Sequence, residues 1–173
     1  MMLPPTGVYF RKEDYASFSR RLLVDLIDTV FLTVLSFVAA FVISLVLPYG
    51  RRAFNLMFVS VFLICWIYMV LLKRSRGGTL GYRIGRVRIV GFDGQRPGIW
   101  ALTLRFLFIP WGFVNWFIDY GWMSSDPHRQ GLRDKLARTY VVNVNAEPAG
   151  TAAVSFRYYD ILGYNFLFQE IDR

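Results

Sequence analysis

One stretch near the start of the chain, residues 20–47, limits what this sequence can fold into more than any other. It opens with two arginines, carries two aspartates in its first turns, and is then almost unbroken apolar sequence to Leu47. A helix that crosses a bilayer needs about 20 mainly apolar residues. The stretch is therefore predicted to be a membrane helix with charges near its start.

Three of those charges share one helical face, because Arg21, Asp25 and Asp28 are spaced by four and three residues. Acidic residues in a membrane helix are costly, so they usually face protein or water and have a partner. Arg21 can reach Asp25 directly, whereas Asp28 lies about 10 Å further along the helix and needs another partner. Two interpretations stay open, ion pairs that fix helix packing and a proton or cation site.

A second apolar run, residues 54–72, carries no charge and follows a short link that contains Arg51 and Arg52. Trp66 and Tyr68 lie near its far end, as in an aromatic belt at a membrane surface. The whole chain is 55% hydrophobic and 18% aromatic, which is membrane-protein composition. The two runs are predicted to form an antiparallel helical hairpin in the membrane.

The third apolar stretch, residues 99–123, has two possible arrangements. Arg105 lies near its start, Pro110-Trp111-Gly112 interrupts it, and Asp119 lies near its end. It either crosses the membrane as a third span or turns back at the Pro-Trp-Gly break as a re-entrant or interfacial hairpin. The hairpin gathers most Lys and Arg residues on one side of the membrane, as the positive-inside rule prefers.

Two strand-like runs support the hairpin. Residues 87–90 alternate in the manner of a strand and run into a Gly-Phe-Asp-Gly turn, and residues 138–144 are rich in β-formers. They can pair only if both lie on one side of the membrane. The fold class predicted is a mainly α-helical membrane protein with two transmembrane helices, a Pro/Gly-broken third segment and a small cytoplasmic two-stranded β element.

Residues 73–88 form a glycine-rich basic segment. The glycines at 77, 81 and 85 recur every four residues, so on a helix they would make one bare stripe that allows close backbone approach. The segment lacks the Lys-Ser/Thr ending of a phosphate-binding loop. Its arginines Arg83, Arg86 and Arg88 are candidates for contact with anionic lipid headgroups.

The sequence offers little for catalysis or for cofactor binding. Cys65 is the one cysteine, so neither an intrachain disulfide nor a cysteine metal cluster is available. No Ser/His/Asp set, metal spacing or cofactor fingerprint is present, and His128 lies in a charged loop where a surface or capping role is expected. The net charge of +8 indicates membrane orientation before nucleic acid. We expect no enzyme activity, cofactor, metal site or nucleic-acid partner.

Several short blocks follow one another in a distinctive order over residues 17–144. The blocks are Arg21 with Leu26-Ile27-Asp28, Gly77-Gly78-Thr79-Leu80-Gly81, Val87–Val90 with Asp93-Gly94, Leu104-Arg105 with Pro110 and Gly112, and residues 126–139 with Asp126, Arg129 and Asp134. In order and spacing they resemble the RDD family of small bacterial membrane proteins. Asp25 is an extra acid, and Arg133 stands where the family usually has histidine, which argues against a proton relay at that position.

The last part of the chain, residues 145–173, lies beyond these blocks and is unusually aromatic. Exposed apolar surface of this kind usually marks a partner or a membrane surface; a tail folded back on its own hairpin is the alternative. The candidate docking residues are Phe156, Tyr158, Tyr159, Tyr164, Phe166 and Phe168.

These observations predict three segments: a cytoplasmic N-terminal part (1–19), a membrane domain (20–144) and the aromatic tail (145–173). The resemblance implies the bacterial cytoplasmic membrane and, for some members, sodium/proton antiport. We expect a non-catalytic accessory or assembly subunit of a larger membrane complex, with an energy-transducing respiratory or photosynthetic assembly as the first partner to look for. The alternative is an oligomeric cation/proton antiporter centred on Asp28, with Arg21, Asp25, Arg105 and Asp119 as its polar surroundings.

Overall fold

A computed structural model describes residues 6–108, 113–161 and 164–172, and the chain divides into two compact units. One unit is Ser19–Gly85. The other combines the N-terminal part, up to Phe18, with Arg86–Arg173. This division differs from the three consecutive segments expected from the sequence, because both ends of the chain join one unit.

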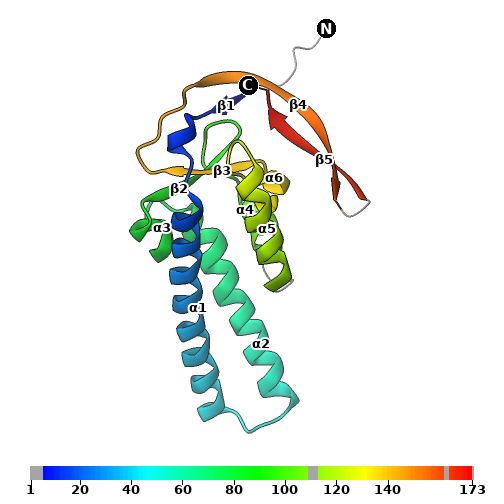
Figure 1. Cartoon of the computed structure of the whole chain (residues 1–173). Helices are drawn as coiled ribbons and strands as arrows, with labels where there is room; N and C mark the ends of the chain where they lie inside the picture. Colours follow the sequence, from blue (N-terminus) through cyan, green and yellow to red (C-terminus); the bar gives the residue numbers. More distant parts are fainter. Residues whose placement is uncertain (1–5, 109–112, 162–163, 173) are drawn as a thin grey trace. The chain divides into compact units, whose positions relative to one another are not determined.

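The Ser19–Gly85 unit is built on a helical hairpin. Helix α1 (Phe18–Val46) ends just before Pro48, and α2 (Arg51–Trp66) continues as a short π-helical segment, η2 (Ile67–Leu72). Figure 1 shows α1 and α2 running side by side in opposite directions. A short helix, α3 (Leu80–Ile84), follows.

Both long helices are candidate membrane spans by length and composition. Large apolar side chains along them are exposed, for example Phe37 at 73% and Phe41 at 63%. The core helix of a water-soluble protein would bury such side chains, whereas lipid solvates them. The two apolar helices predicted from the sequence are confirmed, and they indicate a membrane protein.

The third apolar stretch forms two helices, α4 (Ile99–Phe108) and α5 (Phe113–Ser125), rather than one. The predicted Pro110-Trp111-Gly112 break lies outside the described residues. Arg105 and Asp119 bond to the adjacent residues Asp134 and Arg133, although 14 residues of straight helix would separate them by about 21 Å. Helices α4 and α5 therefore do not continue as one straight helix, as the predicted hairpin requires, and the place of this stretch in the membrane stays a prediction.

The predicted pairing of two short strands is confirmed. Strand β2 (Val87–Gly91) runs antiparallel to β3 (Thr139–Asn143), with Ile89 opposite Val141. Their apolar side chains pack with N-terminal residues in a core made of Phe10, Tyr15, Val90, Tyr140, Val142, Ala146 and Ile171. A third short helix, α6 (Leu132–Ala137), immediately precedes β3.

A second sheet joins the two ends of the chain. Strand β1 (Thr6–Tyr9), which precedes the 3-10 turn η1 (Lys12–Asp14), pairs with the start of the long strand β4 (Gly150–Ile161), and β4 pairs with β5 (Tyr164–Ile171) in the order β1-β4-β5. Figure 1 shows β4 and β5 as a long two-stranded ribbon. The tail thus folds back on itself as a hairpin, which was the alternative considered for it.

Candidate functional site

Asp28 is the most completely enclosed polar group of α1, with an exposed fraction of 0%. Its carboxylate accepts hydrogen bonds from Tyr68 Oη (2.8 Å), Thr79 Oγ1 (2.7 Å) and the Gly81 backbone N–H (2.7 Å). All three donors belong to the same unit as Asp28. We refer to Asp28, Tyr68, Thr79 and Gly81 as the Asp28 cap.

The Asp28 cap supplies hydrogen-bond acceptors for the first backbone N–H groups of α3. Thr79 is the N-cap residue of this helix and also accepts from the Tyr82 N–H (3.4 Å), while Tyr68 Oη accepts from the Leu80 N–H (3.0 Å). The first N–H groups of a helix lack partners within the helix, and negative charge is favourable there. A single carboxylate of α1 therefore holds both η2, through Tyr68, and the N-terminus of α3.

Two of the three regularly spaced glycines explain how α3 approaches α1 so closely. A Cβ on Gly81 would overlap the backbone oxygen of Val24, and one on Gly85 would overlap the Val24 side chain. Gly77 precedes α3, and a Cβ there would meet only Ser75 Oγ at 3.9 Å. The glycine stripe predicted from the spacing is thus a contact at Gly81 and Gly85, without Gly77.

Arg105 and Asp28, which the sequence assigns to one polar cluster, each have hydrogen-bond partners within their own unit. Arg105 donates to Asp134 and to Thr139 Oγ1 (2.6 Å), whereas Asp28 accepts from neutral groups. The reason is that α6 offers Arg105 a buried carboxylate within its own unit. Arg21 and Asp25 are both buried on α1, and their mutual pairing stays a prediction.

A second buried polar cluster surrounds α6, and it accounts for much of the block at residues 126–139. We call it the α6 ion-pair network; its members are Arg105, Asp119, Asp126, Arg133, Asp134, Lys135 and Glu170. Asp134 caps the start of α6 by accepting from the Gly131 N–H (3.1 Å) while it also holds Arg105.

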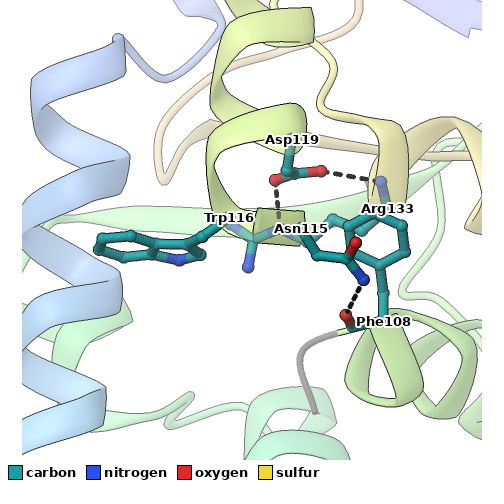
Figure 2. Close-up of a pocket in the computed structure, with 5 residues that line it drawn as sticks. All are labelled: Phe108, Asn115, Trp116, Asp119 and Arg133. Carbon is teal, nitrogen blue, oxygen red and sulfur yellow. Dashed lines mark hydrogen bonds and ion pairs between the residues drawn. The ribbon is translucent and has the colours of Figure 1, made fainter. Parts of the chain in front are cut away.

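Asp119 connects α5 to α6. Its carboxylate takes the Arg133 Nε at 2.9 Å and the Arg133 backbone N–H at 2.9 Å, at one side of a small pocket that Phe108, Asn115 and Trp116 complete (Figure 2). Burial raises the pKa of Asp119, and the Arg133 guanidinium opposes that rise. This arginine is therefore occupied by an ion pair rather than open to a proton relay.

Lys135 is the centre of the network. Its ammonium contacts Asp126 at 2.5 Å and also Glu170 of β5, which in turn accepts from Tyr159 Oη and pairs with Arg157 at 3.4 Å. Burial lowers the pKa of Lys135, but the two carboxylates outweigh burial, and the net shift is upward. Burial likewise raises the pKa of Glu170, but Lys135 and Tyr159 outweigh it, and the net shift is downward.

The loop before α6 is held in place by hydrogen bonds of Asp126 and Arg129. Asp126 accepts from the backbone N–H groups of His128 (2.9 Å) and Gln130 (3.1 Å), and Arg129 donates to the Tyr15 backbone oxygen at 3.2 Å. His128 is buried with its ring against Tyr15 at a centroid distance of 5.5 Å. Of the surface or capping role expected for His128, the surface position is therefore wrong, because Tyr15 of the N-terminal segment packs on this loop.

The aromatic residues of the tail divide into exposed and buried ones. Phe156 and Tyr158 are 59% and 75% exposed, whereas Phe168 is 5% exposed and packs on Trp122. Phe166 is 42% exposed, Tyr159 is half-buried beside Glu170, and the side chain of Tyr164 lies outside the described residues. Leu167, which the sequence reasoning missed, is 48% exposed and lies directly opposite Tyr158.

Sequence reasoning also missed Tyr68, Thr79, Lys135 and Glu170 as members of the polar clusters. The polar residues Thr79 and Lys135 stood inside the recognised blocks, so their position was a usable signal. Within the described parts of the chain, no group of three or more His, Cys, Asp or Glu side chains could hold a metal ion. The arrangement holds helices and strands together, and its carboxylates are hydrogen-bonded or ion-paired.

Comparison with known proteins gives one match. The model of the RDD family matches residues 15–138, which is most of the chain. The matched region contains both polar clusters except Glu170, and it excludes the β4–β5 hairpin. Searches of curated proteins and of solved structures found no significant match.

Proposed function

The chain belongs to the RDD family, and from this we propose that it is a non-catalytic accessory or assembly subunit of a larger membrane protein complex. Its helical hairpin anchors it in the bacterial cytoplasmic membrane, and its β4–β5 hairpin docks on the partner subunits. An energy-transducing complex, respiratory or photosynthetic, is the first partner to look for.

Strand pairing supports the membrane arrangement that this proposal includes. β2 pairs with β3 and β1 pairs with β4, so the strands of each pair must lie on one side of the bilayer. The chain then crosses twice, through α1 and α2, while α4 and α5 return to the side from which they start. The positive-inside rule makes that side the cytoplasm, because Arg51 and Arg52 alone of the Lys and Arg residues fall between the spans.

The observation that carries the docking proposal is an apolar face on the β4–β5 hairpin. Phe156, Tyr158 and Leu167 lie on the same face, since residues two apart on a strand, and directly paired residues, point the same way. We call these three residues the aromatic face. They are exposed, and they lie outside the region that matches the family model. Aromatic residues are enriched in the cores of protein interfaces.

The buried polar groups favour a structural role. The Asp28 carboxylate is occupied by three donors, and the acids around α6 are bonded to Arg105, Arg133 and Lys135. Such groups position helices without performing chemistry, and breaking a buried pair is strongly destabilising.

Purification of the tagged native protein in mild detergent, with mass analysis, tests the proposal. Wild type is expected to bring down unlike subunits in stoichiometric amounts. The variant Phe156→Ser/Tyr158→Ser/Leu167→Ser is expected to lose most of them, because it removes the aromatic face but leaves Phe168 and Glu170 in place. The control Tyr49→Ser changes an exposed aromatic residue of the α1–α2 link and is expected to lose none. A clean homo-oligomer would contradict the proposal.

A second candidate is an oligomeric cation/proton antiporter centred on Asp28. The observation that favours it is a fully buried carboxylate in a candidate span. Wild-type protein reconstituted in liposomes would then show sodium-dependent proton flux, and Asp28→Asn would abolish that flux. Flux equal to that of empty liposomes excludes this candidate.

A further inference from the structure

The uncharged lengths of the two spans set the depth of the Asp28 cap in the membrane. Residues 29–47 carry no charge and, at about 1.5 Å per residue, extend for about 28 Å. Residues 53–72 are likewise uncharged and extend for about 30 Å. The hydrocarbon core of a bilayer is about 30 Å thick, so both spans match it in length. Asp28 and Leu72 therefore lie at the same boundary of the hydrocarbon.

The Asp28 cap brings α3 to this boundary. Thr79 and Gly81 bond to Asp28, and Gly81 and Gly85 pack on Val24, so α3 is held against the first turns of α1. The buried side of α3 holds Gly81 and Tyr82, whereas Leu80 (42%) and Ile84 (55%) are exposed. An exposed apolar pair at that depth fits the zone where headgroups meet acyl chains.

At the end of the unit that holds α3, the exposed charged side chains are all positive. Arg74, Arg76 and Arg83 are exposed, and we call them the basic rim. The acidic residues between Ser19 and Gly85 are Asp25 and Asp28, and both are buried. Lys73 adds a further cation that lies 4.4 Å from the centroid of the Tyr82 ring. No exposed acid of this unit therefore competes for the basic rim.

From this placement we infer that α3 and the basic rim form a binding site for anionic phospholipid headgroups. The leaflet concerned is the one at the Asp28 end of the two helices. Arginine presents paired N–H donors that suit phosphate, and basic residues next to a span are attracted to anionic lipid. Arg86 and Arg88, which the sequence also suggested for this role, belong to the other unit, where Arg88 donates to the Ala146 backbone oxygen (2.6 Å). The inference rests on the proposed membrane placement and is independent of docking by the aromatic face.

The test uses the full chain in maltoside micelles, with bound phosphatidylglycerol and phosphatidylcholine counted by native mass spectrometry. Wild type is expected to prefer phosphatidylglycerol. Each basic residue near an anionic surface contributes roughly fivefold, so Arg74→Gln/Arg76→Gln/Arg83→Gln is expected to reduce the preference on the order of 100-fold. The control Arg51→Gln/Arg52→Gln removes cations at the opposite end of the hairpin and is expected to keep the preference.

Three results would overturn the inference: equal binding of the two lipids by wild type, an unchanged preference in the triple variant, or an equal loss in the control. If the triple variant fails to fold, a salt titration of wild type decides, because exposed charges are screened at high ionic strength. A preference insensitive to salt then contradicts the inference. Carbonate extraction separates the two proposals: a chain that washes off membranes contradicts the membrane placement itself.

Discussion

At the scale of single residues, Asp28 acts as a cap shared by two segments. Helix α3 has five residues, which is too short to be stable alone in water. Its position therefore depends on the Asp28 carboxylate and on the absence of side chains at Gly81 and Gly85. Both dependences can be tested by conservative substitutions.

Asp28→Asn is expected to destabilise the Ser19–Gly85 unit. The amide loses the charge that strengthens three hydrogen bonds, and its NH2 group faces donors. Hydrogen bonds to charged groups are worth about 1.5–3 kcal/mol, so a loss of at least this size is expected. Thermal unfolding in detergent, followed by tryptophan fluorescence, measures it. Asp93→Asn is the control, because Asp93 is exposed and accepts from the Gln95 N–H of its own turn. Equal melting temperatures for the two variants would contradict the cap.

Gly81→Ala is expected to push α3 away from α1, since the new methyl group meets backbone rather than a movable side chain. Overpacking typically costs about 1–3 kcal/mol. Gly77→Ala has space at its site and is the matched control. Limited proteolysis in the 73–86 segment, compared between the two variants, checks the result. Similar cleavage rates would show that the close approach at Gly81 is unimportant.

At the scale of elements, α6 joins α4, α5 and β5 through buried ion pairs. Replacing one buried member leaves its partners as uncompensated charges. The exposed Arg157, which pairs with Glu170, is expected to tolerate change. The network explains why a six-residue helix holds its place between α4, α5 and the second sheet.

Lys135→Met is expected to cost about 3–5 kcal/mol, because Asp126 then loses its ion pair and Glu170 keeps only the exposed Arg157 as a cationic partner. Arg157→Gln removes an exposed partner of Glu170 and is expected to cost under about 1 kcal/mol. Urea unfolding of both variants in detergent measures the two costs. Comparable costs would mean that Lys135 is as well solvated as Arg157.

The coupling between Lys135 and Glu170 is expected to depend on pH. Glu170 has a pKa below its ordinary 4.5, so its stabilisation is present above pH 4.5 and disappears as pH falls through the folded-state pKa. Lys135 has a pKa above 10.5, so its stabilisation is present below pH 10.5 and disappears as pH rises through the folded-state value. A double-mutant cycle of Lys135→Met and Glu170→Gln measures the coupling. A coupling that stays constant as pH falls well below 4.5 would contradict the pair.

At the scale of the whole molecule, the proposed membrane placement and the strand pairing together predict which parts of the chain share a side of the membrane. Single cysteines in a Cys65→Ala background test this with a membrane-impermeant thiol reagent. Lys12→Cys, Arg96→Cys and Glu147→Cys are expected to be labelled from one side and Arg51→Cys from the other, since all four positions are exposed. Labelling of Glu147→Cys from the side of Arg51→Cys would indicate a third span.

Features set by local pattern were predictable. Long uncharged runs identify two apolar helices, because no other element satisfies its backbone in lipid. Alternating β-formers at 87–90 and 138–144 identify β2 and β3. The side-chain partners of these elements could not be predicted in the same way. Asp28 accepts hydrogen bonds from Tyr68, 40 residues away, and from Thr79, 51 residues away, and the sequence contains many other polar groups that could have served.

The amino-acid sequence by itself determined that this chain has two long apolar helices, a paired strand element and a place in its family, since apolar length, strand periodicity and motif order are local properties. Only the tertiary structure decided that the tail joins the N-terminus in one sheet, that neutral donors hold Asp28, and that Arg105 belongs to Asp134. Those choices depend on which groups the folded backbone brings within hydrogen-bonding distance. That distance is set by the packing of elements far apart in the chain.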